Sequence, residues 1–236
     1  MDEHAEPEIV FQLIKVLRVK PGDTVTLLPS GAAVMTEYVF DVAASSKRGV
    51  ELTLKEQHPN SHELDGELGL LLCLPNKPEK LELIVQKAVE IGATRIDLVH
   101  GDFSQMKHQL RPERLQKILM EAAEQSERGT VPVLQLHGQL TDFLTALAPE
   151  ERNSLAVAME RSHGAGTLND LSGKSGHSIT VLVGPEGGFS DAEKAQIDRL
   201  KIRTFSLGKR VLRMETAAIV SLGMAALQLD SNSQDA

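Results

Sequence analysis

Three glycines, a proline and a carboxylate fall within the five positions from Gly184 to Gly188, after the apolar run "ITVLV". A simple turn needs one glycine or one proline, so the extra glycines indicate a loop that a ligand approaches closely. Ligands of open α/β sheets bind beyond the carboxyl ends of the strands, which is where this loop falls. Because neither a Walker motif nor G-x-G-x-x-G is present, a phosphate cradle is disfavoured. A tight turn without a ligand is the alternative.

A second loop, "LGKRVLRMETA" at 207–217, also runs from a strand-like segment into a helix-like one. It holds Lys209, Arg210 and Arg213, the clearest basic cluster of a chain whose formal net charge is −8. Arginine stays protonated and pairs well with phosphate or with a developing anion. A solvated surface turn is the alternative, and Glu215 and Thr216 could equally serve to cap the following helix.

The elements that position these loops alternate between strands and helices from residue 71 onward, which predicts a mostly parallel sheet. Both loops then lie at the same edge of that sheet and form one site. We expect Asn76 with Glu79, and Ser190 with Glu193, to form capping boxes at the starts of two helices.

Residues 1–70 form a different pattern, in which apolar and polar residues alternate as in strands. The segment 24–46 is interrupted by Pro29, Ser30 and Gly31, which is typical of a hairpin. We therefore predict two domains, an all-β module over 1–70 and an α/β domain over 71–236.

Composition excludes several classes of protein. Trp is absent and Tyr38 is the single tyrosine, which argues against a general stacking-type binder of single strands. No apolar stretch reaches the ~20 residues of a membrane span, and the start of the sequence lacks a signal-peptide pattern. Cys73 lies in an apolar run and is expected to be a buried, inert thiol. We expect a cytoplasmic protein without a membrane partner, and no metal, since the histidines lack metal-ligand spacing.

The two loops together, "LVGPEGGFSDAE" and "LGKRVLRMETAAI", resemble the signature of the RsmE family of ribosomal RNA methyltransferases in the SPOUT superfamily. The segments "IKVLRVKPGD", "KLELIVQKAVEIGATRIDLV" and "RLQKILMEAAEQSERGTVP" resemble other parts of that family, so the likeness covers nearly the whole chain. It implies a SPOUT α/β domain with a trefoil knot over 71–236, preceded by a PUA-like β-barrel that binds RNA over 1–70.

The resemblance also implies transfer of a methyl group from S-adenosyl-L-methionine to N3 of a uridine in 16S ribosomal RNA. The substrate would be small-subunit ribosomal RNA or the assembled 30S subunit, and the enzyme a homodimer. A dimer also agrees with the last helix-like segment, which is apolar over a wide arc. The residues expected to contact the cofactor are Leu182, Gly184, Pro185, Glu186, Gly187, Leu207, Gly208, Leu212, Met214, Glu215, Thr216 and Ala217.

For catalysis we expect Arg213 to stabilise the uridine anion or hold RNA phosphate, and Glu186 or Glu215 to accept the proton, directly or through water. The chain departs from the family at Met214, where the family has Thr, and at Phe103, where it has Arg. The second departure motivates two alternatives, a different ribosomal or transfer RNA nucleotide as target, or a non-catalytic RNA-binding homologue. The expected RNA contacts are Lys15, Arg18, Lys20, Lys209 and Arg210.

Overall fold

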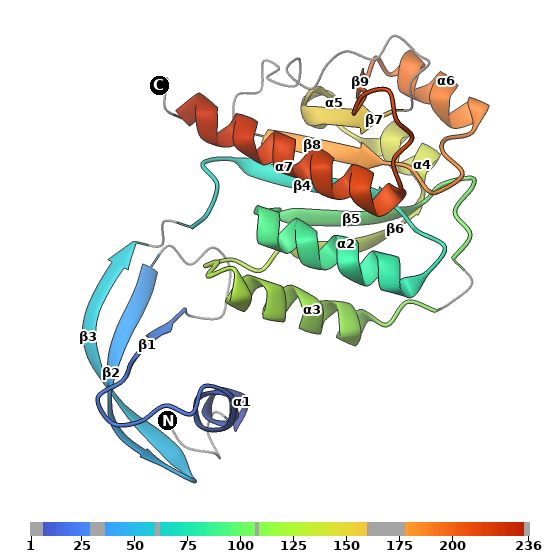
Figure 1. The fold of residues 1–236 in the computed structure, drawn as a ribbon. Helices are drawn as coiled ribbons and strands as arrows, with labels where there is room; N and C mark the ends of the chain where they lie inside the picture. The colour runs from blue at the N-terminus through green and yellow to red at the C-terminus, as the bar shows by residue number, and fades with distance from the viewer. Residues whose placement is uncertain (1–6, 29–35, 60–61, 107–108, 160–177, 234–236) are drawn as a thin grey trace. The chain divides into compact units, whose positions relative to one another are not determined.

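The computed structural model describes residues 7–28, 36–59, 62–106, 109–159 and 178–233. The chain divides into two compact units, Met1–His62 and Glu63–Ala236 (Figure 1). The predicted boundary between residues 70 and 71 falls inside strand β4, Glu67–Cys73, so the division comes earlier in the chain than expected.

The first unit contains a three-stranded antiparallel sheet in the order β1-β2-β3. Its strands are β1, Thr24–Leu27; β2, Thr36–Ser46; and β3, Gly49–Pro59. β1 and β2 pair antiparallel, as the hairpin pattern predicted, while Pro29, Ser30 and Gly31 lie outside the described residues. Over the described residues these strands form an open sheet rather than a closed barrel.

The prediction that this unit is entirely β is wrong at its start. Helix α1, Pro7–Phe11, continues into the π-helix η1, Gln12–Val16. Val10 and Leu13 are both 3% exposed, and their spacing of three residues places them on one helical face. Leu13 packs with Val42 and Val50 of the sheet, so burial against the sheet favours a helix there.

The second unit is built on a six-stranded sheet in the order β6-β5-β4-β8-β7-β9, in which every pairing is parallel. Its strands are β4, Glu67–Cys73; β5, Arg95–His100; β6, Val133–Gln139; β7, Leu155–Ala158; β8, Ser178–Val183; and β9, Arg203–Phe205. The predicted parallel sheet is therefore confirmed. The trefoil knot stays a prediction, because 160–177, between β7 and β8, lies outside the described residues.

Helices cover both faces of this sheet (Figure 1). α2, α3 and α7 share one apolar core with the sheet, and α4 and α6 share the other. The helices are α2, Pro78–Ile91; α3, Pro112–Gln125; α4, Leu140–Ala146; α5, Pro149–Ser154; α6, Asp191–Arg199; and α7, Met214–Ser233. Within the described ranges, none of these helices is both long and apolar enough to span a bilayer.

The two predicted capping boxes have different outcomes. At α6, the Glu193 N–H donates to Ser190 Oγ at 3.2 Å and the Ser190 N–H donates to Glu193 Oε2 at 2.7 Å, as predicted. At α2 the prediction is wrong, since Lys77 is the N-cap and Asn76 lies outside the helix. Pro78 takes the first helical position, where its fixed φ and missing N–H are favourable, and this moves the start of the helix.

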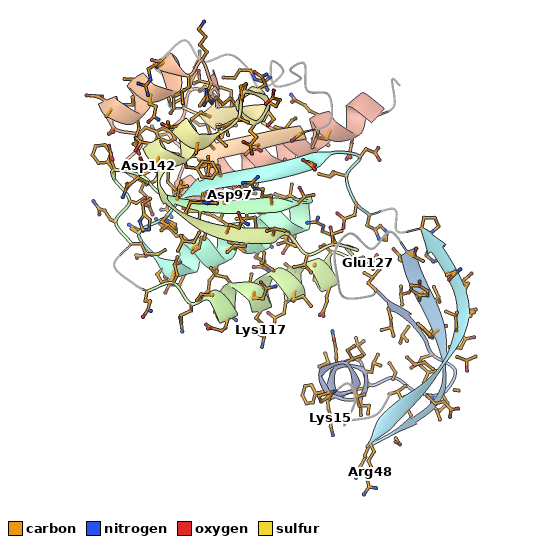
Figure 2. The ribbon with its side chains drawn as sticks, turned by 180° about the vertical axis from the view of Figure 1, so that it is seen from behind. Lys15, Arg48, Asp97, Lys117, Glu127 and Asp142 are labelled. Atoms are coloured by element: carbon orange, nitrogen blue, oxygen red, sulfur yellow. The ribbon has the colours of Figure 1, made fainter. Side chains whose placement is uncertain are left out.

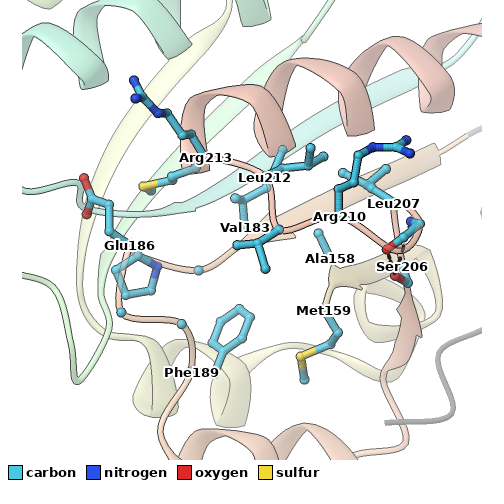
Figure 3. Close-up of a pocket in the computed structure, with 18 of the residues that line it drawn as sticks. Ala158, Met159, Val183, Glu186, Phe189, Ser206, Leu207, Arg210, Leu212 and Arg213 are labelled. Carbon is cyan, nitrogen blue, oxygen red and sulfur yellow. Dashed lines mark hydrogen bonds between the residues drawn. The ribbon is translucent and has the colours of Figure 1, made fainter. Parts of the chain in front are cut away.

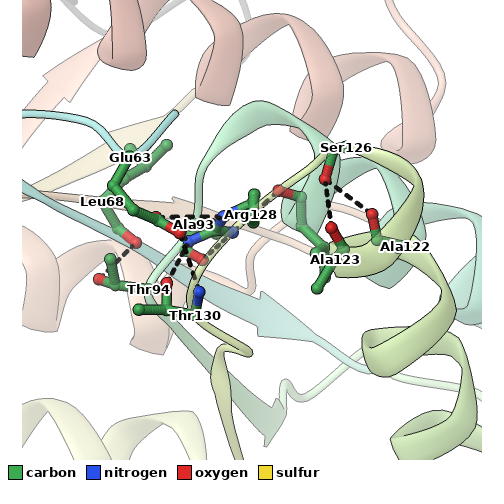
Figure 4. Close-up of polar contacts among 10 residues, drawn as sticks. Glu63, Leu68, Ala93, Thr94, Ala122, Ala123, Ser126, Arg128 and Thr130 are labelled. Atoms are coloured by element: carbon green, nitrogen blue, oxygen red, sulfur yellow. Dashed lines mark hydrogen bonds and ion pairs between the residues drawn. The ribbon is translucent and has the colours of Figure 1, made fainter. Parts of the chain in front are cut away.

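The chain enters the second unit at an ion pair between Glu63 and Arg128 (Figure 4). Arg128 is 4% exposed, and its Nη2 lies 2.7 Å from Glu63 Oε2. Its Nη1 donates to the carbonyl oxygens of Val89 at 2.9 Å and Ala93 at 2.7 Å. Burial raises the pKa of Glu63. The hydrogen bonds and charge of Arg128, together with the hydrogen bonds of Thr130, lower this pKa by more, so it lies below its ordinary value. This pair ties the entering chain to the end of α2.

Replacing Glu63 with Gln is expected to lower the free energy of unfolding by about 3 kcal/mol, because the buried Arg128 charge loses its partner. The pKa of Glu63 in the folded state lies below the ordinary 4.5. Its stabilisation is therefore complete above about pH 4.5 and is lost as the pH falls through the lower folded-state pKa. Urea denaturation at neutral and acidic pH measures both effects. The control is Glu67→Gln, an exposed carboxylate nearby; equal urea midpoints for Glu63→Gln and the unmodified protein would contradict the prediction.

Candidate functional site

The glycine loop after β8 and the basic loop after β9 line one pocket at the carboxyl ends of the strands (Figure 3). The cavity has a volume of about 460 Å³, within the range of small-molecule sites. Its walls come from 158–159, 183–189, 206–208 and 210–214, with Lys80, Lys194 and Ala217. Two loops separated in sequence thus form a single site, as the strand-end rule predicted.

The glycine loop owes part of its composition to close packing. The Gly188 N–H donates to the Pro185 carbonyl oxygen at 2.9 Å, and Gly188 has a φ of +72°, in the left-handed region. A Cβ at Gly184 would lie 2.9 Å from the Phe189 ring, and a Cβ at Gly187 would lie 2.9 Å from Phe103 Cβ. The sequence alone suggested ligand approach as the reason for these glycines, but neighbouring side chains already require two of them.

A buried carboxylate joins this loop to the loop after β5. Glu193 is 0% exposed, and besides the Ser190 N–H it accepts the Asp102 N–H at 2.9 Å. The Ser190 hydroxyl in turn donates to the Asp102 carboxylate. Cys73 is buried nearby, and burial, followed by the charge of Glu193, raises the pKa of its thiol. The expected buried, unreactive thiol is thus what the structure has.

Glu186 lies in an ion pair at the margin of the pocket. Its Oε1 is 2.7 Å from Lys80 Nζ, and its Oε2 accepts the Asn76 N–H at 3.2 Å. Burial raises the pKa of Glu186, but Lys80 and the backbone N–H donors outweigh it, so the pKa lies below its ordinary value. A carboxylate held in this way takes up protons poorly, and its evident role is to fix the glycine loop to the start of α2.

Two arginines of the basic loop line the pocket. Figure 3 shows Arg213 on the side of Glu186 and Arg210 on the side of Ser206. The Arg213 side chain forms no hydrogen bond or ion pair with any residue that the structure describes, so the alternative pairing with Glu215 is not formed. Within that part of the chain, no carboxylate neutralises the charge that Arg213 places on the pocket wall.

Most residues predicted to contact a cofactor lie on the pocket wall. These are Gly184, Pro185, Glu186, Gly187, Leu207, Gly208, Leu212, Met214 and Ala217. Leu182, Glu215 and Thr216 do not line it. Leu182 is 0% exposed and packs in the core on the face with α4 and α6. Glu215 Oε2 is buried and has no hydrogen-bond partner among the described residues.

Sequence reasoning missed part of the wall, namely Lys80, Ala158, Met159, Val183, Phe189, Lys194, Ser206 and Val211. Ala158 and Met159 come at the end of β7, and the rule used for β8 and β9 would have found them. Lys80 reaches the site only because β4 and β8 are neighbours, for which its local sequence gives no signal.

The remaining predicted RNA contacts are exposed. Lys209 lies beside the pocket without lining it, and Lys15, Arg18 and Lys20 lie in the first unit. Figure 2 shows Lys15 on the helical segment of that unit. Across the residues with described positions, no three His, Cys, Asp or Glu side chains gather in a way that would hold a metal ion.

Comparison with known proteins gives consistent matches over most of the chain. A family model described as an RNA methyltransferase domain matches residues 62–226. Ribosomal RNA small subunit methyltransferase E of Rickettsia conorii is 30% identical, over 95% of this chain and 89% of that protein. The protein of the same name from Synechocystis is 33% identical, over 93% of this chain and 71% of its own length.

A solved structure has the same fold. The crystal structure of ribosomal RNA small subunit methyltransferase E from Neisseria gonorrhoeae, bound to S-adenosyl methionine, aligns with a TM-score of 0.78 and 29% identity. The alignment covers 94% of this chain and 88% of that one. With the pocket, the parallel sheet and these matches taken together, the chain belongs to the RNA methyltransferase family that includes ribosomal RNA small subunit methyltransferase E.

Proposed function

We propose that this protein is an S-adenosylmethionine-dependent methyltransferase that acts on N3 of a uridine in small-subunit (16S) ribosomal RNA. The observation that carries the proposal is the single pocket formed by the loops after β8 and β9. Membership of the RNA methyltransferase family and the cofactor bound to the Neisseria relative support it.

The pocket fits a nucleoside cofactor in its chemistry. Leu207, Leu212 and Met214 offer apolar surface suited to an adenine ring, and the glycine loop brings backbone close to the cavity without side chains between. When bound, S-adenosylmethionine supplies an electrophilic methyl group on a sulfonium ion. The protein has to orient the uridine, exclude water and manage the proton on N3.

Arg213 is suited to stabilise the negative charge that develops on the uridine during methyl transfer. Uridine N3–H is a weakly acidic imide, so negative charge develops on the base as the proton leaves. A guanidinium on the pocket wall stabilises that charge, and Arg213 has no competing carboxylate among the described residues. Glu186 is paired with Lys80 and is a poor proton acceptor. Glu215 does not line the pocket, so it cannot take the N3 proton directly. Its Oε2 has no hydrogen-bond partner among the described residues, and we therefore assign it proton acceptance through a bridging water.

The pocket rim supplies local positive charge in an acidic protein. Arg210, Arg213 and Lys194 line the cavity, and Lys209 lies next to them. Phosphate contacts of this kind position RNA on a protein whose overall charge of −8 would repel it. We expect the free RNA or the assembled 30S subunit to be the substrate, and the cytoplasm, where ribosomes are, to be the place of action.

We further propose a homodimer formed through α7. Val220, Met224 and Leu227 are 39%, 38% and 70% exposed, and their spacing puts them on one side of this helix. An exposed apolar stripe of this kind is typical of an interface.

The deciding experiment is incubation of the protein with labelled S-adenosylmethionine and 30S subunits that lack the modification. Mass spectrometry of the digested RNA then locates the methyl group. A single N3-methyluridine in 16S RNA is the expected product. Methyl transfer to a different nucleotide, or to transfer RNA, would retain the enzyme class but refute the target; cofactor binding without transfer to either would refute the activity.

Replacing Arg213 with Ala is expected to slow methyl transfer about 100-fold while leaving cofactor affinity nearly unchanged, because charge stabilisation acts on the uridine. Arg213→Lys should retain part of the rate. Transfer assays and calorimetry with S-adenosylmethionine measure the two properties. The control is Arg199→Ala, which removes an exposed arginine of α6 outside the pocket wall. An equal loss of methyl transfer and cofactor binding, or no loss of either, would contradict the proposed role of Arg213.

Replacing Lys15, Arg18 and Lys20 together with Gln is expected to weaken RNA binding and reduce its salt dependence. Each lost phosphate contact lowers the slope of log K against log salt by about 0.7 for single strands. Fluorescence anisotropy over a salt series measures both. Lys117→Gln, on the exposed side of α3 (Figure 2), is the control. An unchanged slope would show that these cations do not touch phosphate.

Replacing Leu227 with Glu is expected to convert the dimer into a monomer at micromolar concentration, because a charge placed in an apolar interface must be desolvated. Sedimentation velocity gives the oligomeric state. The control, Leu136→Glu, changes a leucine of β6 that is 53% exposed. A monomeric unmodified protein, or a dimeric Leu227→Glu variant, would contradict the proposed interface.

A further inference from the structure

Phe103 is an exposed aromatic side chain beside the pocket. It is 46% exposed, whereas in the described part of the second unit Phe143 is half-buried, and Phe189 and Phe205 are 6% and 1% exposed. A single exposed apolar residue is ordinary on a protein surface. Two features distinguish Phe103: hydrogen bonds fix the backbone around it, and its ring lies against a residue of the pocket wall.

A hydrogen-bonded turn fixes the backbone on both sides of Phe103. The Ser104 N–H donates to the Gly101 carbonyl oxygen at 2.9 Å, and the Gly101 N–H donates to Ser104 Oγ at 3.0 Å. The preceding residue, Asp102, is tied to the buried Glu193 carboxylate at 2.9 Å. The turn therefore fixes the backbone from which the ring projects, so less conformational entropy is lost when a ligand binds there.

The ring also lies against the loop that forms the pocket wall. A Cβ built on Gly187 would be 2.9 Å from Phe103 Cβ, 3.4 Å from Cγ and 3.5 Å from Cδ2. Gly187 lines the cavity and Phe103 does not, so the ring contacts a residue of the pocket wall without lining the cavity itself. A base resting on this ring would lie next to the methyl-donor site without occupying it.

We infer that Phe103 is a stacking platform for a base of the single-stranded RNA segment that carries the target nucleotide. The inference rests on the proposed function and adds a residue that positions the substrate. Aromatic rings stack any base through its π-face, and the contact needs an exposed, rigid ring near a cationic surface. Phe103 has the exposure and a backbone fixed by hydrogen bonds, and Arg213, on the Glu186 side of the pocket wall (Figure 3), supplies the positive charge.

Variants at position 103 separate stacking from simple packing. Phe103→Leu retains apolar bulk against Gly187 but removes the π-system, while Phe103→Tyr retains the ring. Phe103→Leu and Phe103→Ala are expected to lower kcat/KM for RNA about 5- to 100-fold, through KM for RNA, with cofactor affinity unchanged. Phe103→Tyr should remain close to the unmodified protein. A Phe103→Leu variant with full activity, or equal loss of cofactor binding, would overturn the inference.

A fluorescence experiment tests the contact without depending on catalysis. The chain contains no tryptophan, so Phe103→Trp introduces a single reporter whose emission a stacked base quenches. Quenching is expected on adding a uridine-containing single-stranded RNA, and not for the control Leu136→Trp on β6. Bound RNA without quenching would refute stacking. If the unmodified protein transfers no methyl group but position 103 is quenched, the proposed function fails and the stacking platform stands.

Discussion

A buried carboxylate needs hydrogen-bond donors, and Glu193 finds them in the backbone of two loops that follow different strands. The N–H groups of Ser190 and Asp102 both point to it, and the Ser190 hydroxyl bonds to the Asp102 side chain. Burying this charge without donors would cost several kcal/mol, so the two loops are held together whenever the unit is folded. The shape of the glycine loop, the position of Phe103 and one wall of the pocket all depend on that arrangement.

Much of the second unit could be predicted from the sequence, because its central strands β4 and β5 are buried on both faces. β4 is apolar from Leu68 to Cys73, and Leu70 and Leu72 face one core while Leu71 and Cys73 face the other. The helical start of the first unit could not be predicted, for the opposite reason. It has a buried face of few residues, and the contacts that favour a helix come from strands that follow much later in the chain.

The site was predictable where a single rule applied and not where the fold joined distant residues. The strand-end rule located the loops after β8 and β9. The cofactor contact expected at Leu182 from the family resemblance does not lie on the pocket wall, because this side chain packs on the opposite face of the strand from Val181 and Val183. Glu186 illustrates the other limit. As a sequence position it was a candidate base, but Lys80 pairs with it only once the fold has brought the start of α2 to the loop after β8, and that pairing lowers the affinity of Glu186 for protons.

α7 contributes to both the interior and the pocket of the second unit. Ala218, Leu222 and Ala225 are 0% exposed in the core, and Met214 and Ala217 line the cavity. During translation, every strand of the sheet leaves the ribosome before this helix does, and the core it fills stays open to water until then. The nascent chain therefore has no complete cavity, and it acquires its catalytic surface together with its final cooperative folding step, after the rest of the unit has been synthesised.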